Sequence, residues 1–241
     1  PTKTRHGWKF IAFGPDGKLY VPVGAPCNIC NAGPDYAKIL SMNPDGSDWQ
    51  TVATGIRNSV GFDWQPGTHK LWFTNNGRDL MGDDIPDDTL NRVDKPGEDF
   101  GYPYCHAGNV PDPEFGKGRA CSEFAQPALR LGAHVAALGM RFYVGQMFPA
   151  AYRGAIFIAE HGSWNRSRKS GYRVVVAHVG ADGKVTGAEP FLTGFLDGQT
   201  TLGRPVDVQP LRDGSLLVSD DDNGVIYRVT FVRSSMNAAS R

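Results

Sequence analysis

The sequence predicts an all-β protein, and specifically a β-propeller. The 241-residue chain holds 30 Gly and 17 Pro, and it has no long stretch of helical periodicity. A glycine-containing polar turn followed by an apolar strand returns four times, at residues 14–21, 66–73, 151–158 and 211–218. The separations of 52, 85 and 60 residues between Leu19, Leu71, Ile156 and Leu216 suit four-stranded blades with loops of variable length. A β-sandwich is the alternative, but sandwiches lack a repeat of this length.

Each repeat is expected to contain further strands. An apolar stretch at 8–13 predicts a strand before the first turn. A second apolar strand closes each repeat, and these strands are expected at 37–42, 89–93, 172–179 and 225–231. Residues 1–233 therefore form a single-domain partial propeller in this interpretation, and residues 234–241 form a polar tail.

Charge and hydropathy restrict the class of partner. The chain has 25 Lys and Arg against 25 Asp and Glu, for a net charge of zero. This balance gives no electrostatic basis for binding nucleic acid or an anionic membrane. No apolar run reaches the ~18 residues that a membrane-spanning helix needs. A small molecule is the expected partner.

The four cysteines form two local pairs, Cys27 with Cys30 and Cys105 with Cys121. The second pair brackets a loop rich in Pro and Gly, which is expected between the second and third blades. A zinc site would require the two pairs to come together, and a redox pair would favour a βαβ setting. We therefore predict two disulfides, which persist in the periplasm or outside the cell, where we expect the protein to reside.

Polar residues recur just before the innermost strand of successive repeats. The first repeat has His6 at this position, the second has Arg57 and Asn58, and the fourth has Arg204. The third repeat is the exception and offers only Ala136 and Ala137, after His134. Equivalent positions in a propeller point toward one central funnel, so these side chains are expected to converge. Two guanidinium groups and an imidazole suit a ligand with several carboxylates. The alternative for each residue is an ordinary solvated loop position.

An acidic loop follows the strand of the second repeat. Residues 75–88 contain five aspartates, all within residues 79–88. Calcium prefers such oxygen-rich segments, but the spacing is not that of an EF-hand. The alternative is an acidic, solvated loop that binds no metal.

The loop at residues 160–166 is a further candidate site. It contains His161, Trp164 and Arg166, which offer an aromatic face and cationic donors to a planar acidic ligand. The alternative role for Trp164 is structural, as a plug between blades.

Taken together, residues 6–23, 55–58, 88–91 and 203–208 resemble the soluble quinoprotein sugar dehydrogenases, the glucose/sorbosone dehydrogenase family. The loop at 160–166 resembles the sorbosone and pyranose dehydrogenase branch. The resemblance implies a six-bladed propeller that binds pyrroloquinoline quinone (PQQ) and calcium over its axis. Since four repeats are visible, it also implies that about two blades are missing before Pro1. The chain alone would then end in open apolar walls, where we expect residues such as Trp8, Phe10 and Val229.

The resemblance assigns roles to individual residues. His6 matches the catalytic base, Arg57 and Asn58 match the residues that contact the quinone, and Arg204 matches an arginine that binds carboxylate. His161, Trp164 and Arg166 are the further candidate cofactor contacts, because the lysine of the glucose enzymes has no counterpart here. The metal candidates are the main-chain carbonyls of Gly77 and Arg78, together with Asp87 and Asp88. Val206 stands where the glucose enzymes place a second arginine, which argues against glucose as the substrate.

The implied function is oxidation of an aldose or a sorbosone-like sugar aldehyde by hydride transfer to PQQ. His6 would take the proton, while Arg57 and calcium would stabilise the oxyanion. The sequence does not identify the electron acceptor. Two rival functions remain at this point. One is a calcium-dependent propeller lactonase with Asn58, Asp207 and Glu160 on the metal, and the other is a propeller that only binds a partner.

Overall fold

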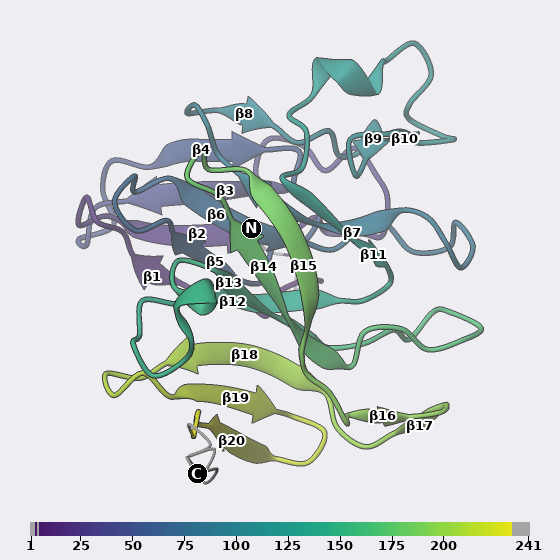
Figure 1. Cartoon of the computed structure of the whole chain (residues 1–241). Helices are drawn as coiled ribbons and strands as arrows, with labels where there is room; N and C mark the ends of the chain where they lie inside the picture. The colour runs from purple at the N-terminus through teal and green to yellow at the C-terminus, as the bar shows by residue number, and fades with distance from the viewer. Residues whose placement is uncertain (1–2, 4, 233–241) are drawn as a thin grey trace, which may run out of the picture.

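The computed structural model describes residue 3 and residues 5–232, and the polar tail at 234–241 lies outside this part. The described chain forms four main sheets in chain order (Figure 1). Two short two-stranded ribbons accompany them, and one of these pairs β16 (Leu196–Asp197) with β17 (Thr200–Thr201). The first sheet holds β1 (Ala12–Phe13), β2 (Leu19–Val23), β3 (Lys38–Met42) and β4 (Gln50–Thr54). The second holds β5 (Phe62–Trp64), β6 (Leu71–Asn75), β7 (Asp87–Arg92) and β11 (Leu129–Ala133). The third holds β12 (Ala137–Phe142), β13 (Ile156–Glu160), β14 (Arg173–Val179) and β15 (Val185–Leu192), and the fourth holds β18 (Pro205–Pro210), β19 (Leu216–Asp220) and β20 (Val225–Val229).

The predicted all-β class is confirmed, and the four repeats fall in four different sheets. Their strands are β2, β6, β13 and β19. Two 3₁₀ turns, Cys121–Glu123 and Ala150–Tyr152, are the helical elements of the described residues. No helix in this part of the chain is long and apolar enough to cross a membrane. The strand expected at 8–13 shrinks to β1, because the Phe10 amide instead donates to the Val60 carbonyl, at 3.0 Å.

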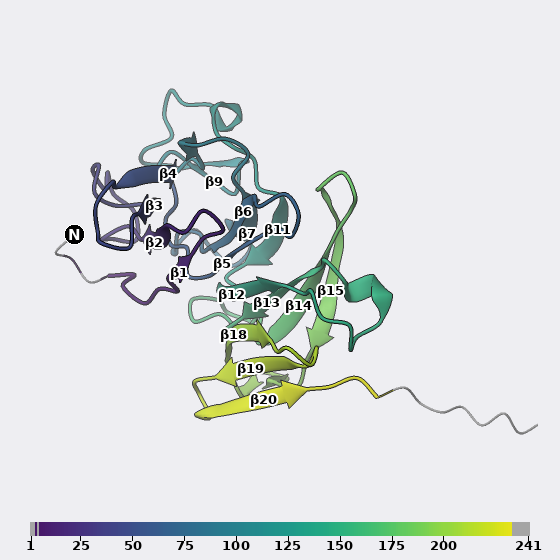
Figure 2. The same ribbon diagram turned by 90° about the vertical axis from the view of Figure 1, so that its left-hand side faces the viewer.

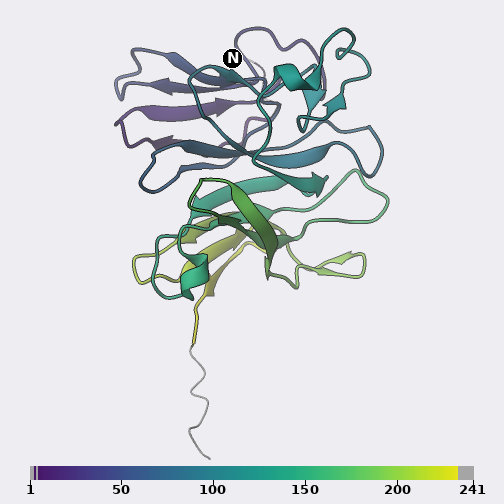
Figure 3. The same ribbon diagram turned by 45° about the horizontal axis from the view of Figure 1, so that its top comes forward.

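The sheets stack face to face (Figure 3), so the second strands of the two inner sheets, β6 and β13, are buried on both sides. In β6, Phe73 packs against the first sheet and Trp72 against the third. In β13, Ile158 faces the second sheet and Phe157 faces the fourth. Two-sided burial explains why these strands read as nearly continuous apolar runs. Complete burial of one such side chain contributes roughly 1.5–3 kcal/mol.

The stack is an arc and not a closed barrel, with the first and last sheets at its two ends (Figures 2 and 3). The exposed apolar residues at these ends include Trp8, 92% exposed, and Ile226, 67% exposed. The expectation for Phe10 and Val229 was wrong. Phe10 packs into the core between the first two sheets, and Val229 packs into the core between the last two.

The disulfide-bonded loop is an excursion from the second sheet and does not connect two blades. After β7 the chain forms β8 (Glu98–Asp99), which pairs in parallel with β4 of the first sheet. It then forms the ribbon β9 (Cys105–His106) and β10 (Val110–Pro111), and it returns as β11 beside β7. The expected inter-blade position was wrong because the fourth strand of the second sheet lies after the excursion.

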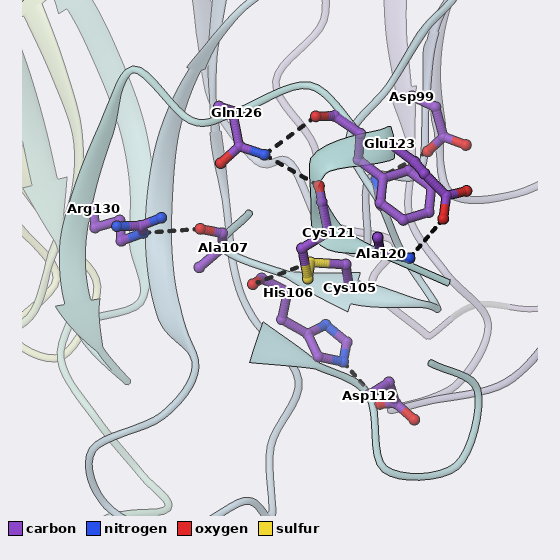
Figure 4. The surroundings of a disulfide bond; sticks show 12 residues. Asp99, Cys105, His106, Ala107, Asp112, Ala120, Cys121, Glu123, Gln126 and Arg130 are labelled. Carbon is purple, nitrogen blue, oxygen red and sulfur yellow. Dashed lines mark hydrogen bonds and ion pairs between the residues drawn. A yellow bond between two sulfur atoms is a disulfide. The ribbon is translucent and has the colours of Figure 1, made fainter. Parts of the chain in front are cut away.

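Both predicted disulfides are present, Cys27–Cys30 and Cys105–Cys121. Figure 4 shows Cys105–Cys121 joining β9 to the 3₁₀ turn. Gln126 donates to the Cys121 carbonyl at 3.2 Å, which ties the turn to the chain that leads to β11. On the other side of the ribbon, His106 Nε2 lies 2.8 Å from Asp112 Oδ2.

Candidate functional site

Loops from all four sheets meet around one pocket of about 230 Å³. These loops either enter an innermost strand or leave the second strand of a sheet, and the innermost strands β5, β12 and β18 are neighbours. The structure brings nine of the eleven predicted site residues to this pocket: His6, Arg57, Asn58, Gly77, Arg78, Asp88, His161, Trp164 and Arg204. Arg166 and Asp87 do not line it. The rim positions that recur along the sequence therefore do converge.

His6 enters the pocket before β1, with a left-handed backbone (φ 54°). Its Nδ1 donates to the Ala25 carbonyl at 2.7 Å, so that Nε2 is the basic nitrogen. Burial lowers the pKa of His6 to about 4, and the positive charge of Arg57 adds to the effect. His6 is thus neutral at pH 7, as a general base must be.

A glycine provides the space for this histidine. A Cβ atom at Gly24 would lie 2.6 Å from the His6 Cβ, closer than two carbons can approach. Gly24 directly follows β2. The end of β2 and the chain that leads into β1 can therefore pack closely, because no side chain lies between Gly24 and His6.

Arg57 is a fixed, buried cation, with 4% of its surface exposed. Its Nε and Nη2 donate to the main-chain and side-chain oxygens of Asn28, at 2.9 and 2.8 Å. Nη2 also donates to Asp79 at 3.0 Å, and Nη1 donates to the Asn76 carbonyl at 3.3 Å. Four of its five N–H donors have protein partners, so the guanidinium is held in place before any ligand binds.

Arg204 lies across the pocket from a different sheet. It donates to the carbonyls of His161 and Gly162, at 3.2 and 2.8 Å, and its guanidinium lies 5.5 Å from the ring centre of Tyr172. His161 Nε2 lies 2.9 Å from Asp221. Burial lowers the pKa of His161. Two arginines and two neutral histidines, from loops of different sheets, thus line one pocket.

Asp88 supports the pocket wall from behind. It is buried, and its two oxygens accept the amides of Gly77 and Ala136, each at 2.7 Å. Burial raises the pKa of Asp88 to about 6. The carboxylate therefore joins the loop after β6 to the entrance of β12.

The four predicted calcium ligands are two main-chain carbonyls, of Gly77 and Arg78, and two carboxylates, of Asp87 and Asp88. The carbonyls of Asn76 and Asp79 accept hydrogen bonds, whereas those of Gly77 and Arg78 between them accept none from the described residues. Two such oxygens on a pocket wall fit main-chain ligands of a hard cation. Asp87 lies outside the pocket, and the described residues contain no group of three or more His, Cys, Asp or Glu side chains able to hold a metal. The residues thus fit a cation only if a bound ligand supplies most of its oxygens.

Arg78 connects the pocket to the disulfide-bonded excursion. It pairs with Asp112, which also contacts His106, and with Glu114. Its buried Nε has no hydrogen-bond partner among the residues described. The Arg78 guanidinium is thus held by the excursion, and the Gly77–Arg78 backbone forms part of the pocket wall.

Two side chains of the loop at 160–166, Trp164 and Arg166, lie in different surroundings. Trp164 is 71% exposed on the pocket rim, so the alternative of a plug between blades was wrong. Arg166 turns away and donates to the Asp83 carbonyl and to Asp84, both at 2.9 Å. Arg166 therefore does not line the pocket in which we predicted that it contacts a cofactor.

Sequence reasoning missed Lys9, Asn28 and His134. Lys9 donates to the Asn58 side chain and to the Ser59 carbonyl. Burial lowers the pKa of Lys9 to about 7. His134 lines the pocket, where its Nε2 donates to the Gly82 carbonyl at 2.8 Å. His134 could have been found from its place before β12, but no sequence signal points to Lys9 or Asn28.

The metal ligands required by a lactonase do not come together. Asp207 pairs with Arg141 at 3.2 Å, and Glu160 pairs with Arg173 at 2.7 Å. Asn58 lines the pocket, but neither carboxylate does. This geometry argues against the lactonase alternative.

A family model described as TrAA12-like matches residues 36–232. The chain belongs to the TrAA12-like family. A protein of Borreliella burgdorferi described as uncharacterized is 40% identical over 221 residues, which are 90% of this chain and 58% of that protein. This TrAA12-like chain therefore spans less than two thirds of that relative.

Solved structures share the fold at lower identity. The calcium structure of the Trichoderma reesei family AA12 enzyme is 22% identical, with a TM-score of 0.77 over 90% of this chain and 66% of that one. The pyranose dehydrogenase PQQ domain from Coprinopsis cinerea is 21% identical, with a TM-score of 0.74 over 92% and 69%. The PQQ-bound aldose sugar dehydrogenase from Streptomyces coelicolor is 23% identical, with a TM-score of 0.60 over 86% and 54%. The family match and these shared folds confirm the resemblance seen in the sequence.

Proposed function

We propose that this TrAA12-like chain carries the site of a PQQ-dependent dehydrogenase that oxidises an aldose or a sorbosone-like sugar aldehyde. The observation that carries the proposal is that His6, a neutral base beside Arg57, shares one pocket with the cations Arg57 and Arg204. The named activities of the fold relatives, pyranose and aldose sugar dehydrogenation with PQQ, agree with it. A six-bladed ring and a periplasmic or secreted location belong to the same proposal.

The charges of the pocket suit a planar ligand with several carboxylates. Arg204 has N–H donors beyond those given to His161 and Gly162, and Arg57 has one beyond its four protein contacts. The exposed indole of Trp164 offers a flat face at the rim. Bound PQQ would supply the electrophilic carbon that accepts the hydride.

The role of His6 follows from its tautomer. The Ala25 carbonyl holds the proton of Nδ1, so Nε2 can take a proton from the C1 hydroxyl of an aldose, or from the hydrate of a sugar aldehyde, as the C1 hydride passes to the cofactor. A base with a pKa of about 4 is weak. An anionic ligand beside Arg57 would offset the repulsion from that cation and raise the pKa of His6 toward the working pH. Ligand binding and base strength are therefore coupled through Arg57.

Calcium would sit at the carbonyls of Gly77 and Arg78, with the remaining oxygens coming from the cofactor and water. Its contribution would be to polarise the quinone oxygen together with Arg57. A glycine suits this wall, because a Cβ at Gly77 would lie 3.0 Å from the Pro86 ring.

A direct experiment adds PQQ to the protein with calcium or with a chelator, and follows absorbance and dye-linked oxidation of aldoses. We expect binding and turnover that both need calcium. Sugar oxidation that is indifferent to PQQ and chelator would overturn the proposal. Lactone hydrolysis without a chromophore would instead support the lactonase, and ligand binding without turnover would support a binding module.

A further inference from the structure

The Cys27–Cys30 disulfide closes a four-residue ring directly beside the pocket. The ring begins soon after β2, and its middle residues are Asn28 and Ile29. The Tyr102 hydroxyl fixes the ring from outside, because it accepts the Cys30 amide at 3.0 Å and lies 3.3 Å from the Cys27 sulfur. Residues 27–30 are thus held both by the disulfide within the ring and by Tyr102 outside it.

Asn28 uses its polar atoms on two residues of the pocket wall. Its Oδ1 accepts from Arg57 Nη2 and from the Asp79 amide, each at 2.8 Å. Its Nδ2 donates to the Asp79 carbonyl at 3.0 Å, and its main-chain oxygen accepts from Arg57 Nε at 2.9 Å. The Asn28 side-chain amide therefore makes two hydrogen bonds to the main chain of Asp79, as a neighbouring strand would, and it also binds the Arg57 guanidinium.

The same segment reaches the proposed base. The Ala25 amide donates to the Arg57 carbonyl at 2.8 Å, and the Ala25 carbonyl accepts from His6. Residues 25–30 thus contact the backbone of Arg57, the side chain of Arg57 and the imidazole of His6.

We propose that Asn28 is a positioning residue for Arg57 and Asp79, and that the Cys27–Cys30 ring serves to hold Asn28 in place. The proposal rests on the proposed function for its effect on PQQ, while the contacts themselves concern the ligand-free protein. Without the Asn28 amide, the Arg57 guanidinium keeps only its bonds to Asp79, Asn76 and the Asn28 main chain. It can then turn away from the orientation that a carboxylate or quinone oxygen requires.

The chain offers a matched control in the same loop. Asn31 follows the ring, and its side chain accepts only the Gly33 amide, at 3.3 Å. The variants Asn28→Ala and Asn31→Ala therefore remove the same group, from inside and from outside the ring. The double variant Cys27→Ser/Cys30→Ser opens the ring and leaves Asn28 in place, which separates the two parts of the proposal.

The test has one measurement without ligand and one with PQQ. In ligand-free protein we expect the Asp79 amide to lose protection from hydrogen exchange in Asn28→Ala and, to a smaller extent, in the ring-opened variant. In calcium buffer we expect the PQQ dissociation constant to rise about ten- to hundred-fold for Asn28→Ala, because bonds to a charged group are lost. Asn31→Ala should match the wild type in both measurements.

Different failures have different meanings. Unchanged exchange at Asp79 in Asn28→Ala would overturn the positioning role. If the wild type does not bind PQQ, the proposed function fails, while the exchange measurement still decides whether Asn28 holds Asp79. If Asn28→Ala does not fold, Asn28→Leu keeps the size of the side chain and removes both Oδ1 and Nδ2, and the same measurements apply to it. A lower melting temperature with an unchanged PQQ dissociation constant would make Asn28 merely structural and would also overturn the proposal.

Discussion

The Nδ1 hydrogen of His6 is donated to the main-chain carbonyl of Ala25 across 2.7 Å. A carbonyl can only accept, so this contact fixes the tautomer and leaves Nε2 as the basic atom. The histidine is also held in a left-handed backbone conformation at the entrance to its strand. The orientation and tautomer of His6 are therefore set by its contact with the first sheet, and burial, together with the nearby charge of Arg57, lowers its pKa and keeps it neutral.

Replacement of His6 by Ala should lower turnover by about 10²- to 10⁴-fold, the usual contribution of a general base. PQQ should still bind, because the arginines remain. The measurement is steady-state oxidation with PQQ titrated separately, and His69→Ala, in the β5–β6 hairpin, is the control. A His6→Ala protein with nearly normal turnover would transfer the role of base to another residue, with His161 the first to test.

The titration of His6 should be displaced in the free protein. We expect NMR of labelled histidine to give a pKa of about 4, well below the ordinary 6.5, because burial and Arg57 oppose the charge. The unfolded chain then binds more protons than the folded chain between pH 6.5 and 4, so this group makes stability fall as the pH is lowered through that window. Saturation with PQQ should raise the value. A free-protein pKa near 6.5 would contradict the geometry.

Replacement of Gly24 by Ala should disturb His6 without touching any ligand. The added methyl would lie 2.6 Å from the His6 Cβ, so the imidazole must move away from Ala25. We expect a loss of turnover approaching that of His6→Ala. Gly187→Ala is the control, since nothing lies within 4 Å of a methyl group there. Equal activity of the two variants would show that the position of His6 does not matter.

Lys9 should give the protein a distinctive alkaline pH dependence. Burial lowers its pKa in the folded state from 10.5 to about 7, so the unfolded chain binds more protons between these values. Stability from this group therefore rises with pH through the window from about 7 to 10.5. In Lys9→Met this rise should disappear, as measured by urea unfolding at pH 6.5 and pH 9. Lys95→Met should retain it.

Loss of the Cys105–Cys121 disulfide should lower stability more than loss of Cys27–Cys30. The sulfurs join residues 16 apart in the first case and three apart in the second. A loop of about 15 residues corresponds to about 3 kcal/mol, or roughly 6–12 °C in melting temperature. Calorimetry of the two Cys→Ser double variants tests this. A larger fall for Cys27–Cys30 would contradict the loop-length account.

The repeats in the sequence were enough to locate the second and third strands of each main sheet, and the rim. His6, Arg57 and Arg204 were predicted together because each precedes the innermost strand of a repeat, and the structure gathers them in one pocket. Asn28 could not be predicted in the same way. Its role depends on how the disulfide ring folds back onto Arg57, and a contact across 29 residues leaves no trace in local spacing.

The errors have a similar origin. Arg166 lies in the predicted loop, but the side of the loop it occupies depends on its bonds to Asp83 and Asp84, which are more than 80 residues away. The excursion after β7 was misplaced because β11, which completes the second sheet beside β7, comes after it in the chain. Both cases involve pairing between distant segments, for which one sequence carries no signal.

The path of that excursion has a mechanical consequence. Because β8 joins the first sheet and β11 returns to the second, a strap of chain ties these two sheets together (Figure 1). His6 and Arg57 lie on loops that lead into these two tied sheets, whereas His161 and Arg204 lie on loops of the third and fourth sheets. A continuous core joins the two pairs, with Trp72 of the second sheet packed in one cluster with Met140 and Ile158 of the third. The positions of the two arginines therefore rest on packed sheets, so a ligand with several carboxylates would meet both cations without a rearrangement of the fold.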